Sequence, residues 1–179
     1  MTTDMAATSA AASKAAAAAL LAPHTHDNTA PFSLEGLAGW ARLVGAHDGD
    51  TATVVLEAFP GRFHRVVLRV RGVDACEMTS RDAEVRAKAV RARNRLVEHL
   101  TGLRLDEGRA YTRAQIGRLL GEEPRVVWVE CAGQDKYGRT LADVYPDRGG
   151  ASVAAVLLAE GLAYAYGGGT KRPEAEQLA

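Results

Sequence analysis

The chain has 179 residues, enough for one domain with a substantial hydrophobic core, and its 22 basic residues balance its 22 acidic residues. This balance excludes a general electrostatic attraction to polyanions, so nucleic acid would have to be held by a local group of basic side chains. Two cysteines are too few for a disulfide framework, and no apolar run reaches the roughly 18 to 20 residues that span a bilayer. We expect a monomer without membrane contact, in which Cys76 and Cys131 are free thiols, with one disulfide as the alternative.

Residues 1–31 are rich in Ala, Ser and Thr and predict a disordered or transiently helical N-terminal extension. The alanine run at residues 15–22 lacks the strongly basic start of a signal peptide, so we favour a cytoplasmic over a secreted protein, although the compartment stays undetermined. We expect a folded domain over residues 32–170, with a helical insertion at about 103–123, and a short tail over 171–179. The insertion could be a lid, a partner surface or decoration.

The first half of this domain has a β pattern. Short strands are predicted over residues 41–46 and 51–58, joined by an Asp-Gly turn, and a further strand is predicted over 64–73. Alternate residues of a strand point to opposite faces, so Val66, Leu68 and Val70 share one face. Arg69 is therefore predicted to face away from the apolar side.

A helical period follows. Thr79 or Ser80 is predicted to cap a helix that Gly102 ends. Its apolar stripe consists of Val85, Ala89, Ala92, Leu96 and Leu100. Its other positions are largely basic, which favours a solvated face over a track for nucleic acid, although both interpretations stay open. These basic residues are Arg81, Arg86, Lys88, Arg91, Arg93 and Arg95.

The remaining pattern predicts a second helix over 113–120, a strand over 126–131, and a hairpin whose second strand is 141–145. An apolar helix follows over 152–160. Because several strands occur with separate helices and without regular strand–helix alternation, the predicted fold class is a small α+β domain with a closed or nearly closed sheet.

Chemistry-bearing residues occur where strands end or turn. Asp50 lies in an Asp-Gly-Asp turn, Asp74 and Glu77 follow a strand, and Arg139 lies in the hairpin turn. Carboxylates can hold a hard divalent cation and activate water, and guanidinium groups such as that of Arg69 can neutralise a pentavalent phosphate. Together these residue types favour phosphodiester hydrolysis, whereas each motif alone is typical of an ordinary turn or surface position.

Four stretches in this order resemble the successive signatures of the staphylococcal nuclease (thermonuclease) family. They are residues 48–51 (DGDT), 69–77 (RVRGVDACE), 135–142 (DKYGRTLA) and 160–163 (EGLA). The resemblance implies an OB-type five-stranded barrel with packed helices. It also implies a calcium-dependent endonuclease that cleaves DNA or RNA, prefers single-stranded or unpaired substrates, and leaves 3′-phosphates.

The resemblance also implies roles for individual residues. Arg69 and Arg139 would bind the phosphate, and Glu77 would be the general base. Calcium would be bound by Asp50, Asp74 and the backbone carbonyl of Ala75. Residues expected beside the substrate are Lys136, Tyr137, Tyr164 and Tyr166, although buried packing is an equal alternative for the last two.

One position departs from the family pattern: Cys76 stands where the family usually has proline, which leaves the rigidity of this loop open. The alternative function is a non-catalytic module that binds nucleic acid or protein, and it is disfavoured because every catalytic position keeps its residue type. An OB-type domain unrelated to nucleases would require the four stretches to coincide by chance.

Overall fold

The computed structural model describes residues 13–106, 109–173 and 176–178. Contacts divide the chain into two units, Met1–Phe32 and Ser33–Ala179. In the first unit, residues 13–21 are helical, whereas residues 1–12 of the predicted extension lie outside the described part. No helix in the described ranges has the length and apolarity needed to cross a membrane.

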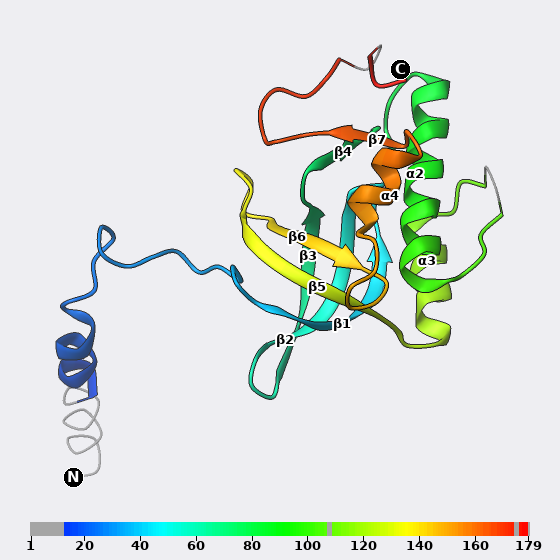
Figure 1. The fold of residues 1–179 in the computed structure, drawn as a ribbon. Coiled ribbons are helices and arrows are strands. Elements are labelled where there is room, and N and C mark those ends of the chain that lie inside the picture. The colour runs from blue at the N-terminus through cyan, green and yellow to red at the C-terminus, as the bar shows by residue number, and fades with distance from the viewer. Residues whose placement is uncertain (1–12, 107–108, 174–175, 179) are drawn as a thin grey trace, which may run out of the picture. The chain divides into compact units, whose positions relative to one another are not determined.

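Five strands of the second unit form a closed barrel (Figure 1). The strands are β1 (Ala38–Ala46), β2 (Thr51–Phe59), β3 (Arg62–Val70), β5 (Arg125–Gln134) and β6 (Thr140–Tyr145). Their order around the barrel is β1-β2-β3-β6-β5, and only the β3–β6 pair is parallel. The barrel and its separate helices confirm the predicted α+β class.

The predicted strand over 64–73 is in fact two strands. The chain turns at Gly72, whose φ of 81° strains any residue with a side chain, and β4 (Val73–Ala75) then leaves the barrel. β4 pairs with β7 (Ala163–Ala165) in a small antiparallel sheet in which Asp74 lies opposite Tyr164. This break places Asp74 on a different sheet from Arg69, although only five positions separate the two residues.

The described helices of this unit are α2 (Ala83–Thr101), α3 (Arg113–Glu122) and α4 (Val153–Ala159). The predicted N-cap of α2 was wrong: Asp82 caps the helix by accepting hydrogen bonds from the backbone N–H groups of Glu84 and Val85. Its predicted end is confirmed, because Gly102 has a left-handed φ of 70°. Arg95 of α2 holds α4 through three hydrogen bonds to Glu160.

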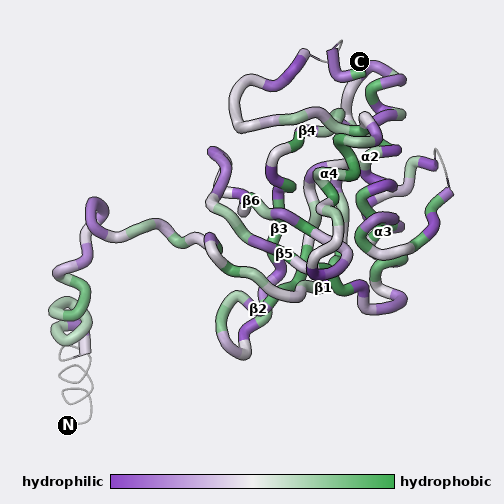
Figure 2. Tube along the Cα trace, viewed as in Figure 1, coloured by the Kyte–Doolittle hydropathy of each residue, from purple (hydrophilic) through white to green (hydrophobic). Residues whose placement is uncertain are grey.

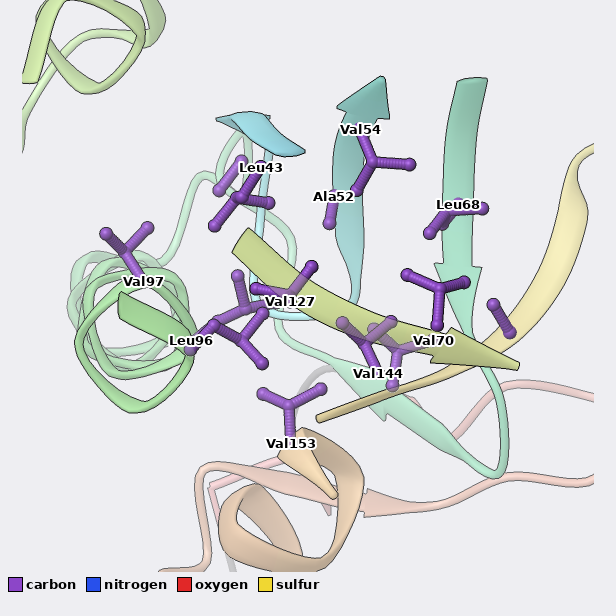
Figure 3. Packing of buried hydrophobic residues seen from close by; sticks show 14 of the residues in the cluster. Leu43, Ala52, Val54, Leu68, Val70, Leu96, Val97, Val127, Val144 and Val153 are labelled. Atoms are coloured by element: carbon purple, nitrogen blue, oxygen red, sulfur yellow. The ribbon is translucent and has the colours of Figure 1, made fainter. Parts of the chain in front are cut away.

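The core fills the barrel and the space between the barrel and α2 (Figure 3). Figure 2 shows hydrophobic and hydrophilic residues mixed along the barrel strands. In β6, buried and half-buried positions alternate strictly because successive side chains point to opposite faces of a strand. The residues labelled in the packed interior include Leu43, Val54, Leu68 and Val127 of the strands and Leu96 of α2. Cys76 and Cys131 are both buried and do not form a disulfide with each other.

The basic face of α2 is not uniformly solvated. Arg81, Arg86 and Arg91 are exposed, but Lys88 and Arg93 are buried. Lys88 Nζ donates a 2.5 Å hydrogen bond to the carbonyl oxygen of Gln177, and burial lowers the pKa of Arg93. The expectation of a solvated face is therefore wrong for these two residues.

Candidate functional site

The turn between β1 and β2 is fixed against the rest of the domain. A Cβ added to Gly49 would lie 2.6 Å from Cβ of Ala92 on α2 and 2.9 Å from Cβ of Ala75 on β4. Only glycine allows so close an approach. The backbone carbonyl of Asp50 accepts a 2.7 Å hydrogen bond from the N–H of Val70. The tight turn therefore holds Asp50 beside the ends of β3 and β4.

Asp50 and Asp74 converge on the guanidinium group of Arg69. Arg69 Nη2 lies 2.6 Å from Asp74 Oδ1, and Arg69 Nη1 lies 3.3 Å from Asp50 Oδ2. Arg69 Nη1 also donates a 2.7 Å hydrogen bond to the carbonyl oxygen of Val73. All three charged residues are at most 5% exposed, so Arg69 is enclosed by the loop after β3 and is not a surface residue.

Burial has the largest effect on the ionisation of Asp50. Burial, and next repulsion from Asp48, raise the pKa of Asp50 to about 7. Two neighbours oppose this shift: the charge of Arg69, and the N–H of Ala75, which donates a 2.7 Å hydrogen bond to Asp50 Oδ2. A further cation that reaches Asp50 would stabilise the charged form of this buried carboxylate.

Glu77 lies just beyond β4, with its side chain about half exposed, and its partner comes from the far end of the chain. Lys171 Nζ lies 2.7 Å from Glu77 Oε1 and 3.1 Å from Asp74 Oδ1. Burial alone would lower the pKa of Lys171, but its hydrogen bonds to Glu77 and Asp74 raise it, so the amine stays protonated. Sequence reasoning missed Lys171, since no local spacing links it to a residue 94 positions away.

The β5–β6 hairpin supplies the other basic groups. Asp135 Oδ1 accepts hydrogen bonds from the backbone N–H groups of Tyr137 and Arg139 at 2.8 and 2.9 Å, and Asp135 Oδ2 accepts one from Arg139 Nε at 2.6 Å. Gly138 has a φ of 78°, which closes the turn. Asp135 therefore orders the turn and orients Arg139.

One pocket of about 770 Å³ is lined by the end of β3, the β5–β6 hairpin and the residues that follow β7. Five basic residues and one acidic residue, Asp135, contribute to its lining, so its charge suits a phosphate group. The five are Arg69, Arg71, Lys136, Arg139 and Lys171. The three carboxylates are not part of this lining, but Arg69 and Lys171 contact them directly.

The three tyrosines predicted to lie beside the substrate occupy different environments. Tyr137, with 73% of its surface exposed, and Tyr166 both line the pocket. For Tyr164 the structure favours the alternative of buried packing. Its ring is buried under the guanidinium of Arg172, and its hydroxyl donates a hydrogen bond to Asp74 Oδ2. From this buried position Tyr164 supports Asp74.

The donor chemistry of Asp50 and Asp74 fits a hard cation. Both groups are buried carboxylates that contact the same guanidinium group, and carboxylate oxygens are ligands that hard divalent cations prefer. In the described part of the chain, however, no three His, Cys, Asp or Glu side chains are grouped closely enough to hold a metal ion by themselves. Backbone oxygen or water would have to complete the coordination.

The family model described as "Staphylococcal nuclease homologue" matches residues 67–179, more than half of the chain. This range contains Arg69, Asp74, Glu77 and Arg139, whereas Asp50 lies before it. A comparison with curated proteins gave no match. The closed barrel agrees with the family's fold, and the chain belongs to the staphylococcal nuclease homologue family.

Proposed function

We propose that the protein is a calcium-dependent endonuclease that hydrolyses phosphodiester bonds in DNA, RNA or both. Family membership indicates nuclease-type chemistry. The observation that carries the proposal is that Arg69 and Arg139 line one basic pocket, while Arg69 and Lys171 connect that pocket to Asp50, Asp74 and Glu77. Phosphate binding and water activation could thus occur at neighbouring positions.

Arg69 and Arg139 bind the scissile phosphate in this proposal. A guanidinium group donates two parallel hydrogen bonds to phosphate oxygens and neutralises the charge that develops as water attacks. Arg139 is restrained by Asp135, and Arg69 is restrained by Asp74 and the Val73 carbonyl, so both groups are oriented before substrate arrives. Little conformational entropy is then lost on binding.

The remaining pocket residues suit an unpaired strand. The exposed ring of Tyr137 offers a surface on which a base can stack, and stacking needs a base that is not covered by its neighbours. Lys136 and Tyr166 line the same pocket and would contact the sugar–phosphate backbone. A preference for single-stranded or unpaired substrates follows.

Glu77 is the general base of the proposed reaction. It takes a proton from the attacking water, which adds to phosphorus in line while the 5′ oxygen leaves, so that the phosphate remains on the 3′ side. Asp50, Asp74 and the carbonyl oxygen of Ala75 would hold calcium, which when bound supplies charge neutralisation and makes nearby water more acidic. Arg69 keeps the two aspartates together.

The proposal predicts that Glu77→Gln slows cleavage of single-stranded DNA by about 100-fold or more, because a positioned general base contributes roughly 10²- to 10⁴-fold. The substitution keeps the size of the side chain and removes its basicity. Cleavage would be followed with calcium, and EDTA should abolish it in the unmodified protein. Glu122→Gln, at an exposed position on α3, is the matched control and should cleave at the unmodified rate.

Equal cleavage by the unmodified protein with calcium, the unmodified protein with EDTA, and Glu77→Gln with calcium would contradict the proposal. Tight binding of the strand without turnover in calcium, magnesium and manganese would instead support a non-catalytic binding module.

A further inference from the structure

A positively charged side chain from the C-terminal part of the chain lies between two of the carboxylates of the site. Lys171 Nζ is 3.1 Å from Asp74 Oδ1 and 2.7 Å from Glu77 Oε1, so one ammonium group bridges the two acids. Asp74 is fully buried, whereas the side chains of Lys171 and Glu77 are about half exposed. The bridge therefore has one end inside the protein and one end in solvent.

Specific contacts fix the place of this lysine. Residues 167–172, here named the tail segment, follow β7 and leave it as an open loop (Figure 1). Before the segment, the N–H of Tyr166 donates to the carbonyl oxygen of Gly72 at 2.9 Å. At its end, the N–H of Arg172 donates to the hydroxyl oxygen of Tyr164 at 3.2 Å, and the guanidinium lies 4.8 Å from the centre of that ring.

The tail segment is also built so that it can move. It begins with Gly167, Gly168 and Gly169, and all its residues are exposed. Glycine loses the most conformational freedom on ordering, and an exposed loop with few apolar contacts opens at low cost. The bridge formed by Lys171 is thus held by local polar contacts and not by the hydrophobic core.

The ammonium group of Lys171 and a metal ion would compete for Asp74. Lys171 Nζ and Arg69 Nη2 both lie within hydrogen-bond reach of Asp74 Oδ1, and Tyr164 donates to Asp74 Oδ2. A divalent cation on this carboxylate would lie a few ångströms from the ammonium group, where like charges repel strongly in a partly buried setting. Arg69 is enclosed by β4 and cannot leave easily, whereas Lys171 can.

We propose that Lys171 is an internal counter-cation of the site, and that a divalent ion binds Asp74 by displacing the Lys171 ammonium group together with the tail segment. This inference rests on the proposed function, because it assumes that the aspartates bind the ion. The tail segment then lowers the affinity for the metal and releases Glu77 to act as a base only when the ion is present.

Calcium titration by calorimetry without substrate tests the displacement. Lys171→Met keeps the length of the side chain and removes the charge, and it should lower the Kd for calcium by about tenfold, since two ion pairs of moderate strength no longer compete. Lys171→Arg should keep a Kd near that of the unmodified protein. Arg118→Met removes a positive charge at an exposed position on α3, outside the tail segment, and it should change the Kd by less than about twofold.

Hydrogen exchange gives a second readout that needs no catalysis. Calcium should speed exchange of the tail segment amides in the unmodified protein, and the segment should exchange fast in Lys171→Met even without calcium. The inference is overturned if the Kd of Lys171→Met is unchanged or higher, if no variant binds calcium, or if calcium leaves the exchange of the segment as it was.

Cleavage assays on the same samples separate this inference from the proposed function. Tighter calcium binding by Lys171→Met, in a protein that cleaves no nucleic acid, would support the displacement and contradict the nuclease. Calcium-dependent cleavage with an unchanged Kd would support the nuclease and contradict the displacement.

Discussion

Asp74 is a fully buried carboxylate whose two oxygens accept hydrogen bonds from the side chains of Arg69, Lys171 and Tyr164. Removing a carboxylate from water is costly, and the cost is offset only when each of its oxygens has donors. Burial, and next the hydrogen bond to Asp74, raise the pKa of Tyr164 to about 12, so this tyrosine stays a donor at neutral pH. Tyr164 is therefore part of the support of the site.

Replacing Tyr164 by phenylalanine should lower the free energy of unfolding by about 1 to 3 kcal/mol, because a buried carboxylate oxygen loses its donor while the ring volume is kept. Urea unfolding at neutral pH without added metal measures this change. Tyr137→Phe is the control. Because the Tyr137 ring is exposed, the free energy of unfolding of this variant should equal that of the unmodified protein. Equal stabilities of the two variants would show that the hydroxyl of Tyr164 contributes nothing to holding Asp74.

The elements that carry the acids meet where β1, β2, β4 and α2 come together. The turn at Gly49 packs on Ala92 of α2 and on Ala75 of β4, so a single glycine sets the distance between the turn, the helix and the small sheet. Because Asp50 follows Gly49 directly and Asp74 precedes Ala75, this contact also sets the relative position of the two aspartates.

Gly49→Ala should therefore lower the free energy of unfolding by about 1 to 3 kcal/mol, the usual cost of overpacking, and should also weaken calcium binding. The added methyl group would lie 2.6 Å from Cβ of Ala92, which cannot rotate away. Gly39→Ala in β1 is the matched control, since its added Cβ would meet no other group within 4 Å. If thermal unfolding finds the two variants equally stable, the close packing at Gly49 is not required.

At the scale of the whole molecule, local patterns predict most of the barrel. Three of these patterns depend only on neighbouring residues, so they can be recognised without knowing the fold. They are the alternation along strands, the Asp-Gly turn and the end of α2 at Gly102. The N-cap of α2 was misplaced because Ser80 and Asp82 are both good caps, and Ser80 Oγ instead accepts from the N–H of Asp82. Local preference alone cannot choose between two such residues.

Contacts between distant segments account for what sequence patterns miss. Strand alternation separates Arg69 from the apolar face of β3. The burial of Arg69, however, depends on its contacts with Val73 and Asp74 of β4, which alternation does not predict. Likewise, Lys88 contacts Gln177, which lies 89 positions away, and Glu77 contacts Lys171, which lies 94 positions away. No periodic pattern in the sequence connects residues so far apart. The resemblance in short stretches indicates the proposed site, whereas the support from Tyr164 and the bridge from Lys171 require the structure.

In the proposed site, the acidic residues after β4 and the arginine of the β5–β6 hairpin act on one phosphate. Single-turnover cleavage of a fluorescent single-stranded oligonucleotide in calcium tests it most directly, with the unmodified protein, Glu77→Gln, Arg139→Gln and the double variant.

Each single substitution should lower the rate by about 100-fold or more, since a general base and a preorganised phosphate-binding group each contribute on that order. The double variant should lose much less than the product of the two factors, because groups that act as a unit are not additive. Rates equal to that of the unmodified protein in all three variants would contradict the assignment of the site.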